Sequence, residues 1–329
     1  MILKCEFSMN LALCYNFFMP ENKVRIISKK KAKRDLSTVG LCLVVYTLFV
    51  LIFPYGFKYF MDIFDPEFVR DEYVYIGVYL LILVIGTFIP FILLKQISKV
   101  KNNRIFGSVS ASFVDLFVQA IICIASCTAL TYVSNILLSY INVESRLLSA
   151  ICLNYGEAYL NNYLYIFMLI IVTPIIEEFA FRGVLINALG KYGKVFGLYA
   201  SAILFALAHS TVGEILPGFA MGYVLGKISL RYKSIQPTIF IHIIFNAFIY
   251  AMVIMPEKYA MYMAYGIGGI CILAFYFFIT GRYRTVKIKK TSGIKTSFRL
   301  FFKSFPIILA IVLLIIHLLL VSYFEFLII

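Results

Sequence analysis

The sequence predicts an all-α fold, a polytopic transmembrane helical bundle of about eight or nine helices. Of the 329 residues, 62% are apolar and 14% are charged, and the mean hydropathy is +0.94. A soluble domain of this length has about 25% charged residues, so the bilayer is the expected solvent. The apolar runs are continuous over about 20 residues, which favours membrane helices over barrel strands that alternate over about 10 residues.

Each expected helix is a long apolar run that ends at charged or turn-forming residues. The runs cover residues 38–61, 73–95, 110–140, 160–190, 195–210, 212–231, 235–255, 258–281 and 305–329. The run at 195–210 is shorter than the roughly 20 residues that a comfortable span needs, so we expect it to cross only part of the bilayer. Asp115 lies near the start of the third run and is expected near the membrane surface or paired with a buried polar group.

The basic residues predict which loops face the cytoplasm. With the N-terminus inside, 24 of the 30 Lys and Arg fall in cytoplasmic segments and four in outer ones. This excess predicts a multi-pass protein of the cell membrane with a cytoplasmic N-terminus. The charge is spread over several short loops, so we expect no nucleic-acid partner. The bilayer itself is the expected partner, with anionic headgroups contributing.

Four regions follow from this organisation. Residues 1–37 form an extension with a basic cytoplasmic segment, and 38–159 hold the first membrane helices. Residues 160–255 form the core that carries the polar motifs, and 256–329 hold the last helices with a basic loop. The first 20 residues are apolar and precede the basic run, the reverse of a signal peptide. Met1 and Met19 both stay open as the start.

Three ionisable residues interrupt the apolar run at 160–190. Glu177, Glu178 and Arg182 each cost roughly 2.5–3.5 kcal/mol at membrane depth, so a chain that keeps them has found them partners or a use. Glu178 and Arg182 are four residues apart and can pair on one helix face. Glu177 then lies on a neighbouring face, free to act as a general base.

Two histidines follow at one-turn spacing from a partner. His209 comes four residues after Phe205, and His242 comes four residues before Asn246. Between them, the glycines at 218, 222 and 226 form a smooth stripe that lets neighbouring helices approach closely. We expect this stripe to draw the polar groups into one site. The third histidine, His317, is alone in the last helix and is expected to serve packing.

These motifs, taken in order, carry a resemblance. Glu177-Glu178-x-x-x-Arg182, Phe205-x-x-x-His209 and His242-x-x-x-Asn246 resemble the CAAX protease and bacteriocin-processing family of intramembrane endopeptidases, also called the abortive-infection family. The resemblance covers about residues 160–250.

The resemblance implies roles for the motif residues. Glu177 would activate a water, and His209 would help to hold it. His242 and Asn246 would donate hydrogen bonds to the oxyanion of the tetrahedral intermediate. Glu178 and Arg182 would be structural or would position the substrate.

The expected reaction is therefore hydrolysis of a peptide bond in a membrane-anchored protein or peptide. A glutamate mechanism without a cofactor is favoured, because the HExxH pairing of familiar zinc proteases is absent. A zinc site with Glu177, His209 and His242 as ligands and an open water position stays open as the alternative.

Two other functions stay open. The polar cluster could serve only as a hydrogen-bond network that locks the bundle. The chain could also be a non-catalytic membrane scaffold or a bacteriocin self-immunity protein, functions that the resemblance also implies. Its richness in Ile, Phe, Tyr, Lys and Asn suggests an AT-rich bacterial genome, and hence peptide precursors as substrates in place of prenylated proteins.

Overall fold

The computed structural model describes residues 29–64, 71–140, 162–209, 211–281 and 294–327. The chain divides into two units, residues 1–32 and 33–329, and nearly all of the described chain belongs to the second. The Met1 and Met19 question and the basic stretch at 282–293 lie outside the described residues. Within them every regular element is helical, so the all-α prediction is confirmed.

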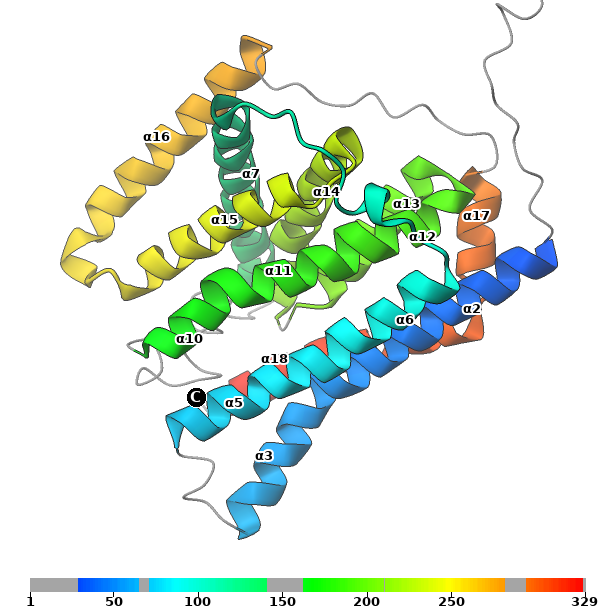
Figure 1. Cartoon of the computed structure of the whole chain (residues 1–329). Helices are drawn as coiled ribbons and strands as arrows, with labels where there is room; N and C mark the ends of the chain where they lie inside the picture. Colours follow the sequence, from blue (N-terminus) through cyan, green and yellow to red (C-terminus); the bar gives the residue numbers. More distant parts are fainter. Residues whose placement is uncertain (1–28, 65–70, 141–161, 210, 282–293, 328–329) are drawn as a thin grey trace, which may run out of the picture. The chain divides into compact units, whose positions relative to one another are not determined.

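The first half of the described chain contains two long helical stretches, α2 to α3 and α5 to α6, followed by the long helix α7 (Figure 1). Its elements are α2 (Lys29–Tyr46), η1 (Thr47–Ile52), α3 (Phe53–Phe64), α5 (Glu72–Leu83), η2 (Val84–Phe88), α6 (Ile89–Ile97), η3 (Asn102–Arg104) and α7 (Phe113–Tyr140). The first helix begins at Lys29, nine residues before the expected start at 38. Lys and Arg are good helix formers, and their long stems can extend a helix beyond the apolar layer.

The second half contains the helices that carry the polar motifs and two terminal helices. Its elements are α10 (Tyr163–Phe167), η4 (Met168–Val172), α11 (Thr173–Glu177), η5 (Glu178–Leu185), α12 (Ile186–Leu189), η6 (Gly190–Tyr192), α13 (Lys194–Leu207), η7 (Val212–Glu214), α14 (Ile215–Tyr232), α15 (Gln236–Ile254), η8 (Glu257–Tyr259), α16 (Ala260–Ile279), α17 (Ile294–Phe301) and α18 (Phe305–Leu327).

Six of the described helices are long and apolar enough to cross a membrane, or seven if one bent pair counts as a span. All nine apolar runs of the sequence contain a helix, but two of them stay outside this count even when the bent pair is one span. The helix Lys194–Leu207 has only 14 residues, as its short apolar run predicted. The helix Ile215–Tyr232 is not among the six, because its glycines, Pro217 and two basic residues dilute its apolar character.

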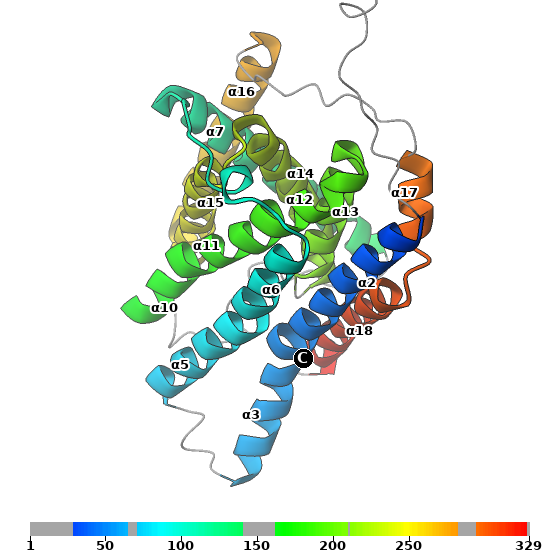
Figure 2. The same ribbon diagram turned by 45° about the vertical axis from the view of Figure 1, so that its right-hand side comes forward.

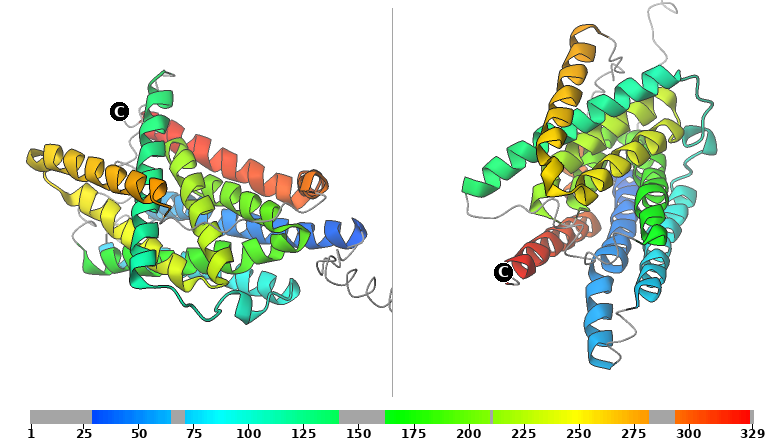
Figure 3. Two further views of the ribbon diagram at one scale, coloured as in Figure 1. Left: turned by 90° about the horizontal axis from the view of Figure 1, so that it is seen from above. Right: turned by 90° about the vertical axis from the view of Figure 1, so that its left-hand side faces the viewer.

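The core is built by close helix packing around α13, α14 and α7. The helix α13 packs along α14, and α14 packs on α7. Figures 1 and 2 both show α2 and α18 side by side, and a methyl group at Gly40 of α2 would stand 2.5 Å from the Ile307 nitrogen of α18. In contrast, α16 has no buried residue and packs mainly on α7 at the edge of the unit (Figure 3).

The glycine stripe of α14 performs the packing that the sequence predicted. A Cβ at Gly222 would stand 2.9 Å from Cα of Ala202, and one at Gly218 would stand 3.1 Å from the His209 ring. Because the Cα of Ala202 is part of the α13 backbone, no side-chain movement can relieve the first contact. The stripe therefore fixes the distance between α13 and α14, and with it the position of the helix that ends just before His209.

We predict that Gly222→Ala lowers the free energy of unfolding by about 1–3 kcal/mol, because the added methyl group forces α13 and α14 apart. Unfolding in mixed micelles would measure this change. The matched control is Gly266→Ala in α16, where nothing lies within 4 Å of the new methyl group. We expect the control to change the same free energy by no more than about 0.5 kcal/mol. Equal effects of the two substitutions would show that the stripe does not limit the packing.

Candidate active site

One long helix carries the glutamate pair. It runs from Tyr163 to Tyr192, as the apolar run at 160–190 predicted, and its hydrogen-bond register changes along its length. The register is α over Tyr163–Phe167, π over Met168–Val172, α again over Thr173–Glu177 and π over Glu178–Leu185. All eight residues of the second π segment are buried. Wide turns of this kind occur often at functional sites, because they re-aim the side chains around them.

One side chain of α13 and one from the next turn of the same helix support the second π segment. The Ser201 hydroxyl of α13 donates a hydrogen bond to the Phe181 carbonyl at 3.1 Å. The Asn187 amide donates to the Gly183 carbonyl at 2.9 Å. These bonds hold the wide turn between α11 and α12, so Glu178 and Arg182 have fixed directions.

Glu178 and Arg182 form a fully buried ion pair. Nη1 of Arg182 lies 2.8 Å from Oε1 of Glu178, and the two side chains are 1% and 0% exposed. The pairing that their spacing predicted is confirmed. Neither Nη atom makes a well-directed hydrogen bond with a described residue. Instead, the guanidinium lies over the Phe205 ring, 3.9 Å from its centroid, which gives the cation a second favourable contact.

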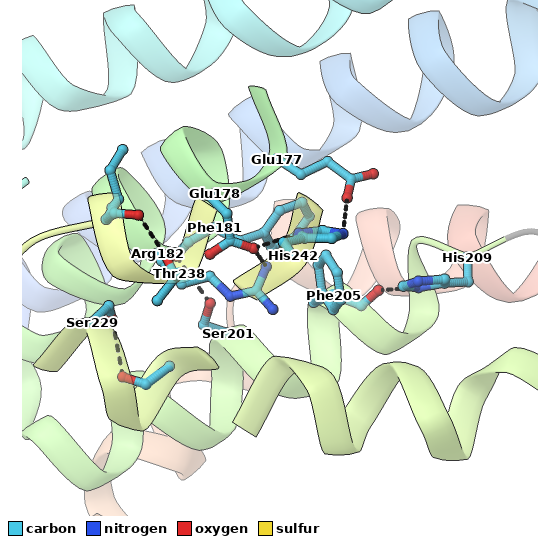
Figure 4. A network of polar contacts seen from close by, with 12 residues as sticks. Glu177, Glu178, Phe181, Arg182, Ser201, Phe205, His209, Ser229, Thr238 and His242 are labelled. Atoms are coloured by element: carbon cyan, nitrogen blue, oxygen red, sulfur yellow. Dashed lines mark hydrogen bonds and ion pairs between the residues drawn. The ribbon is translucent and has the colours of Figure 1, made fainter. Parts of the chain in front are cut away.

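His242 joins the two glutamates. Its Nδ1 lies 2.9 Å from Oε1 of Glu178, and its Nε2 lies 3.7 Å from Oε2 of Glu177 (Figure 4). The Glu177 side chain is 26% exposed, whereas the Glu178 side chain is fully buried. One carboxylate is therefore locked between a cation and an imidazole, and the other remains accessible beside the same imidazole.

His209 lies beside Phe205, apart from the contact between His242 and the two glutamates. Its Nδ1 lies 2.8 Å from the Phe205 carbonyl, and its ring meets the Phe205 ring edge-on at 4.8 Å. The Phe205 and His242 rings also meet edge-on, with their centroids 6.3 Å apart. Figure 4 shows His209 directed toward Phe205, and among the described residues no hydrogen bond or ion pair joins it to Glu177. Phe205 is thus the common neighbour of both histidines and Arg182.

Asn246 satisfies a backbone carbonyl in the glutamate helix. Its Nδ2 donates to the Leu169 carbonyl at 2.9 Å. Just before that helix returns to the α register, the Thr173 N–H bonds the Met168 carbonyl five residues earlier. The next N–H in that series would come from Pro174 and would bond Leu169, but proline has none. The Asn246 amide supplies the missing donor, so it ties α15 to the glutamate helix.

The three residues of the zinc alternative do not assemble. Among the described residues, no three His, Cys, Asp or Glu side chains are grouped so that they could hold a metal ion. His209 lies against Phe205, while Glu177 faces His242. As placed, Glu177, His209 and His242 do not fit a zinc site.

Sequence reasoning missed two contacts of the site. It did not foresee the His242–Glu178 contact, which brings together residues on two helices. It named Phe205 only as a motif position, whereas the ring contacts Arg182 and both histidines. Pro174 was a usable signal, since a proline inside an apolar helix requires a donor from elsewhere.

Two comparisons with known proteins match the region of this site. Residues 159–248 match a family described as "Type II CAAX prenyl endopeptidase Rce1-like". A Bacillus subtilis protein named "Putative membrane peptidase YdiL" is 32% identical over 106 residues, which cover 30% of this chain and 43% of that protein. The chain thus aligns with less than half of that relative. No solved structure matches it.

These matches support the resemblance of residues 160–250 to the CAAX protease and bacteriocin-processing family. The matched residues include all six predicted site residues. The candidate spans agree with a multi-pass membrane location.

We predict that Asn246→Leu lowers the free energy of unfolding by about 1–3 kcal/mol, because it leaves the Leu169 carbonyl without a donor. In a Pro174→Ala background the same change should cost clearly less, since the alanine provides the backbone N–H that proline lacks. Unfolding of the four proteins in mixed micelles completes this double-mutant cycle. An equal cost of Asn246→Leu in both backgrounds would contradict the account of Asn246.

Proposed function

We propose that this protein is an intramembrane endopeptidase that hydrolyses a peptide bond of a membrane-associated protein or peptide. The observation that carries the proposal is the contrast between the two glutamates. Glu178 is buried and held by Arg182 and His242, while Glu177 is partly exposed and faces Nε2 of His242. An accessible carboxylate beside a fixed imidazole is a suitable base for a water.

In the proposed reaction, Glu177 takes a proton from a water as its oxygen attacks the substrate carbonyl carbon. The carbonyl π electrons move to the oxygen and form the oxyanion. When this intermediate collapses, the C–N bond breaks, and Glu177 returns the proton to the leaving amine. The products are a free carboxyl group and a free amino group, so the atoms balance with one water consumed.

His242 is proposed to donate a hydrogen bond to the oxyanion. Its Nδ1–H donates to Glu178, so Nε2 can donate only when the ring is an imidazolium. With that charge, two carboxylates face two cations at the site, and the net charge within the membrane is zero. As an imidazolium, His242 would donate its Nε2–H to the oxyanion that develops beside Glu177.

Asn246 and His209 have supporting roles in the proposal. The Asn246 amide has two N–H groups, of which the Leu169 carbonyl takes one, and the second would serve the oxyanion. His209 donates its Nδ1–H to the Phe205 carbonyl, so Nε2 keeps a lone pair for a hydrogen bond from the attacking water.

The substrate class follows from the membrane location of the site. A membrane-anchored peptide or protein is proposed, and the cytoplasmic N-terminus and bacterial source remain part of the proposal. The Bacillus subtilis relative agrees with a bacterial source. A scaffold or self-immunity protein would need the same buried network, but its function would not depend on the Glu177 carboxylate. The two proposals therefore predict different effects of replacing Glu177.

We predict that Glu177→Gln reduces cleavage of membrane-anchored peptides by about 100-fold or more, since glutamine cannot accept the proton. Purified protein in detergent would be assayed against a library of such peptides, with and without phenanthroline as a zinc chelator. Cleavage that survives the chelator supports the glutamate mechanism. Loss with the chelator and rescue by zinc would favour the metal alternative instead.

The matched control is Asp115→Asn, the same loss of a carboxylate at the start of α7. It should leave cleavage within about twofold of wild type. Full activity of Glu177→Gln would contradict the proposed base. Failure of wild type to cleave any peptide at a stoichiometric ratio would favour the scaffold.

A further inference from the structure

The last two helices meet at a sharp corner. The helices α17 and α18 are bent by 72° at a break of a few residues. The helix α18 has 23 residues, enough to cross the roughly 30 Å hydrocarbon layer at 1.5 Å per residue. If α18 crosses the bilayer, α17 must lie close to the membrane plane.

Packing fixes α17 in this orientation. Phe298 and Phe301 both meet the Phe196 ring edge-on, at centroid distances of 4.9 and 5.7 Å. The Ser297 hydroxyl donates to the Tyr192 carbonyl at 2.8 Å. The corner is thus held against the start of α13 and the end of the glutamate helix (Figure 1).

The outer side of the corner combines cations with exposed aromatic rings. Lys295 and Arg299 are one turn apart on α17, Lys303 lies in the turn that follows, and all three are exposed. Within the described chain none of them makes an ion pair, and residues 294–304 contain no acid. Phe302 and Phe305, beside them, are 53% and 73% exposed.

This combination indicates what covers the surface. Exposed phenylalanines beside unpaired cations are unfavourable in water but suit the boundary between acyl chains and headgroups. There the rings enter the acyl layer, and the cations reach phosphates of the same leaflet. An acidic protein segment would satisfy the charges, but it would leave the two rings unexplained.

We infer that α17 is an interfacial helix and that Lys295, Arg299 and Lys303 bind the phosphate groups of anionic phospholipids. We call these three residues the basic corner. The inference lies outside the matched residues 159–248 and does not depend on the proposed protease activity.

The test titrates the full-length protein, in a zwitterionic detergent, with phosphatidylglycerol or phosphatidylcholine of identical acyl chains. Native mass spectrometry would count the bound lipids. Wild type should retain phosphatidylglycerol selectively. The variant K295Q/R299Q/K303Q should bind it about 10- to 100-fold more weakly, because each cation near anionic lipid contributes to the attraction.

The matched control is K99Q/K101Q/R104Q, which removes three exposed cations from the loop between α6 and α7. This control should keep the selective binding, and thermal unfolding should show both variants folded. Equal losses in the two variants would overturn the inference, since the effect would then be one of net charge. Equal binding of the two lipids by wild type, with capture of a polyglutamate peptide, would overturn it in favour of an acidic protein partner.

Discussion

The buried contact between Arg182, Glu178 and His242 is the constraint on which the site depends. An isolated charge in the membrane interior is costly, so each of these groups needs the others. Arg182 lies on Glu178 and on the Phe205 ring, and Glu178 in turn holds Nδ1 of His242. The contact fixes the direction of Nε2, which faces the accessible Glu177. Removing one partner would therefore disturb both the fold and the candidate chemistry.

Helix packing places the partners of this contact. The π segment aims Glu178 and Arg182 inward, and the Ser201 hydroxyl of α13 supports it. The glycine stripe draws α14 onto α13, and Gly218 leaves room for the His209 ring. Asn246 donates the hydrogen bond that Pro174, without an N–H, cannot supply, and so connects α15 to the glutamate helix. Small residues and backbone carbonyls thus do as much to shape the site as the charged groups do.

The sequence was sufficient for features that depend on composition and on spacing within one helix. Apolar runs predicted the helical bundle, and a spacing of four predicted the Glu178–Arg182 pair. Features that depend on contacts between helices were not predictable in this way. The π register at Glu178 has support from Ser201 of α13, and the position of the His209 ring beside α14 needs the small residue Gly218. The bend before α18 is held by packing of α17 against Phe196. The apolar run of the last helix gives no sign of this packing.

The central claim is that Glu178 and Arg182 are stable in the membrane interior only as a pair. A double-mutant cycle with Glu178→Gln and Arg182→Met, followed by unfolding in mixed micelles, tests it most directly. The account predicts that each single change costs about 3–5 kcal/mol, because it leaves one buried charge unpaired, and that the double change costs clearly less than the sum. Additive costs, with no coupling between the two positions, would contradict it.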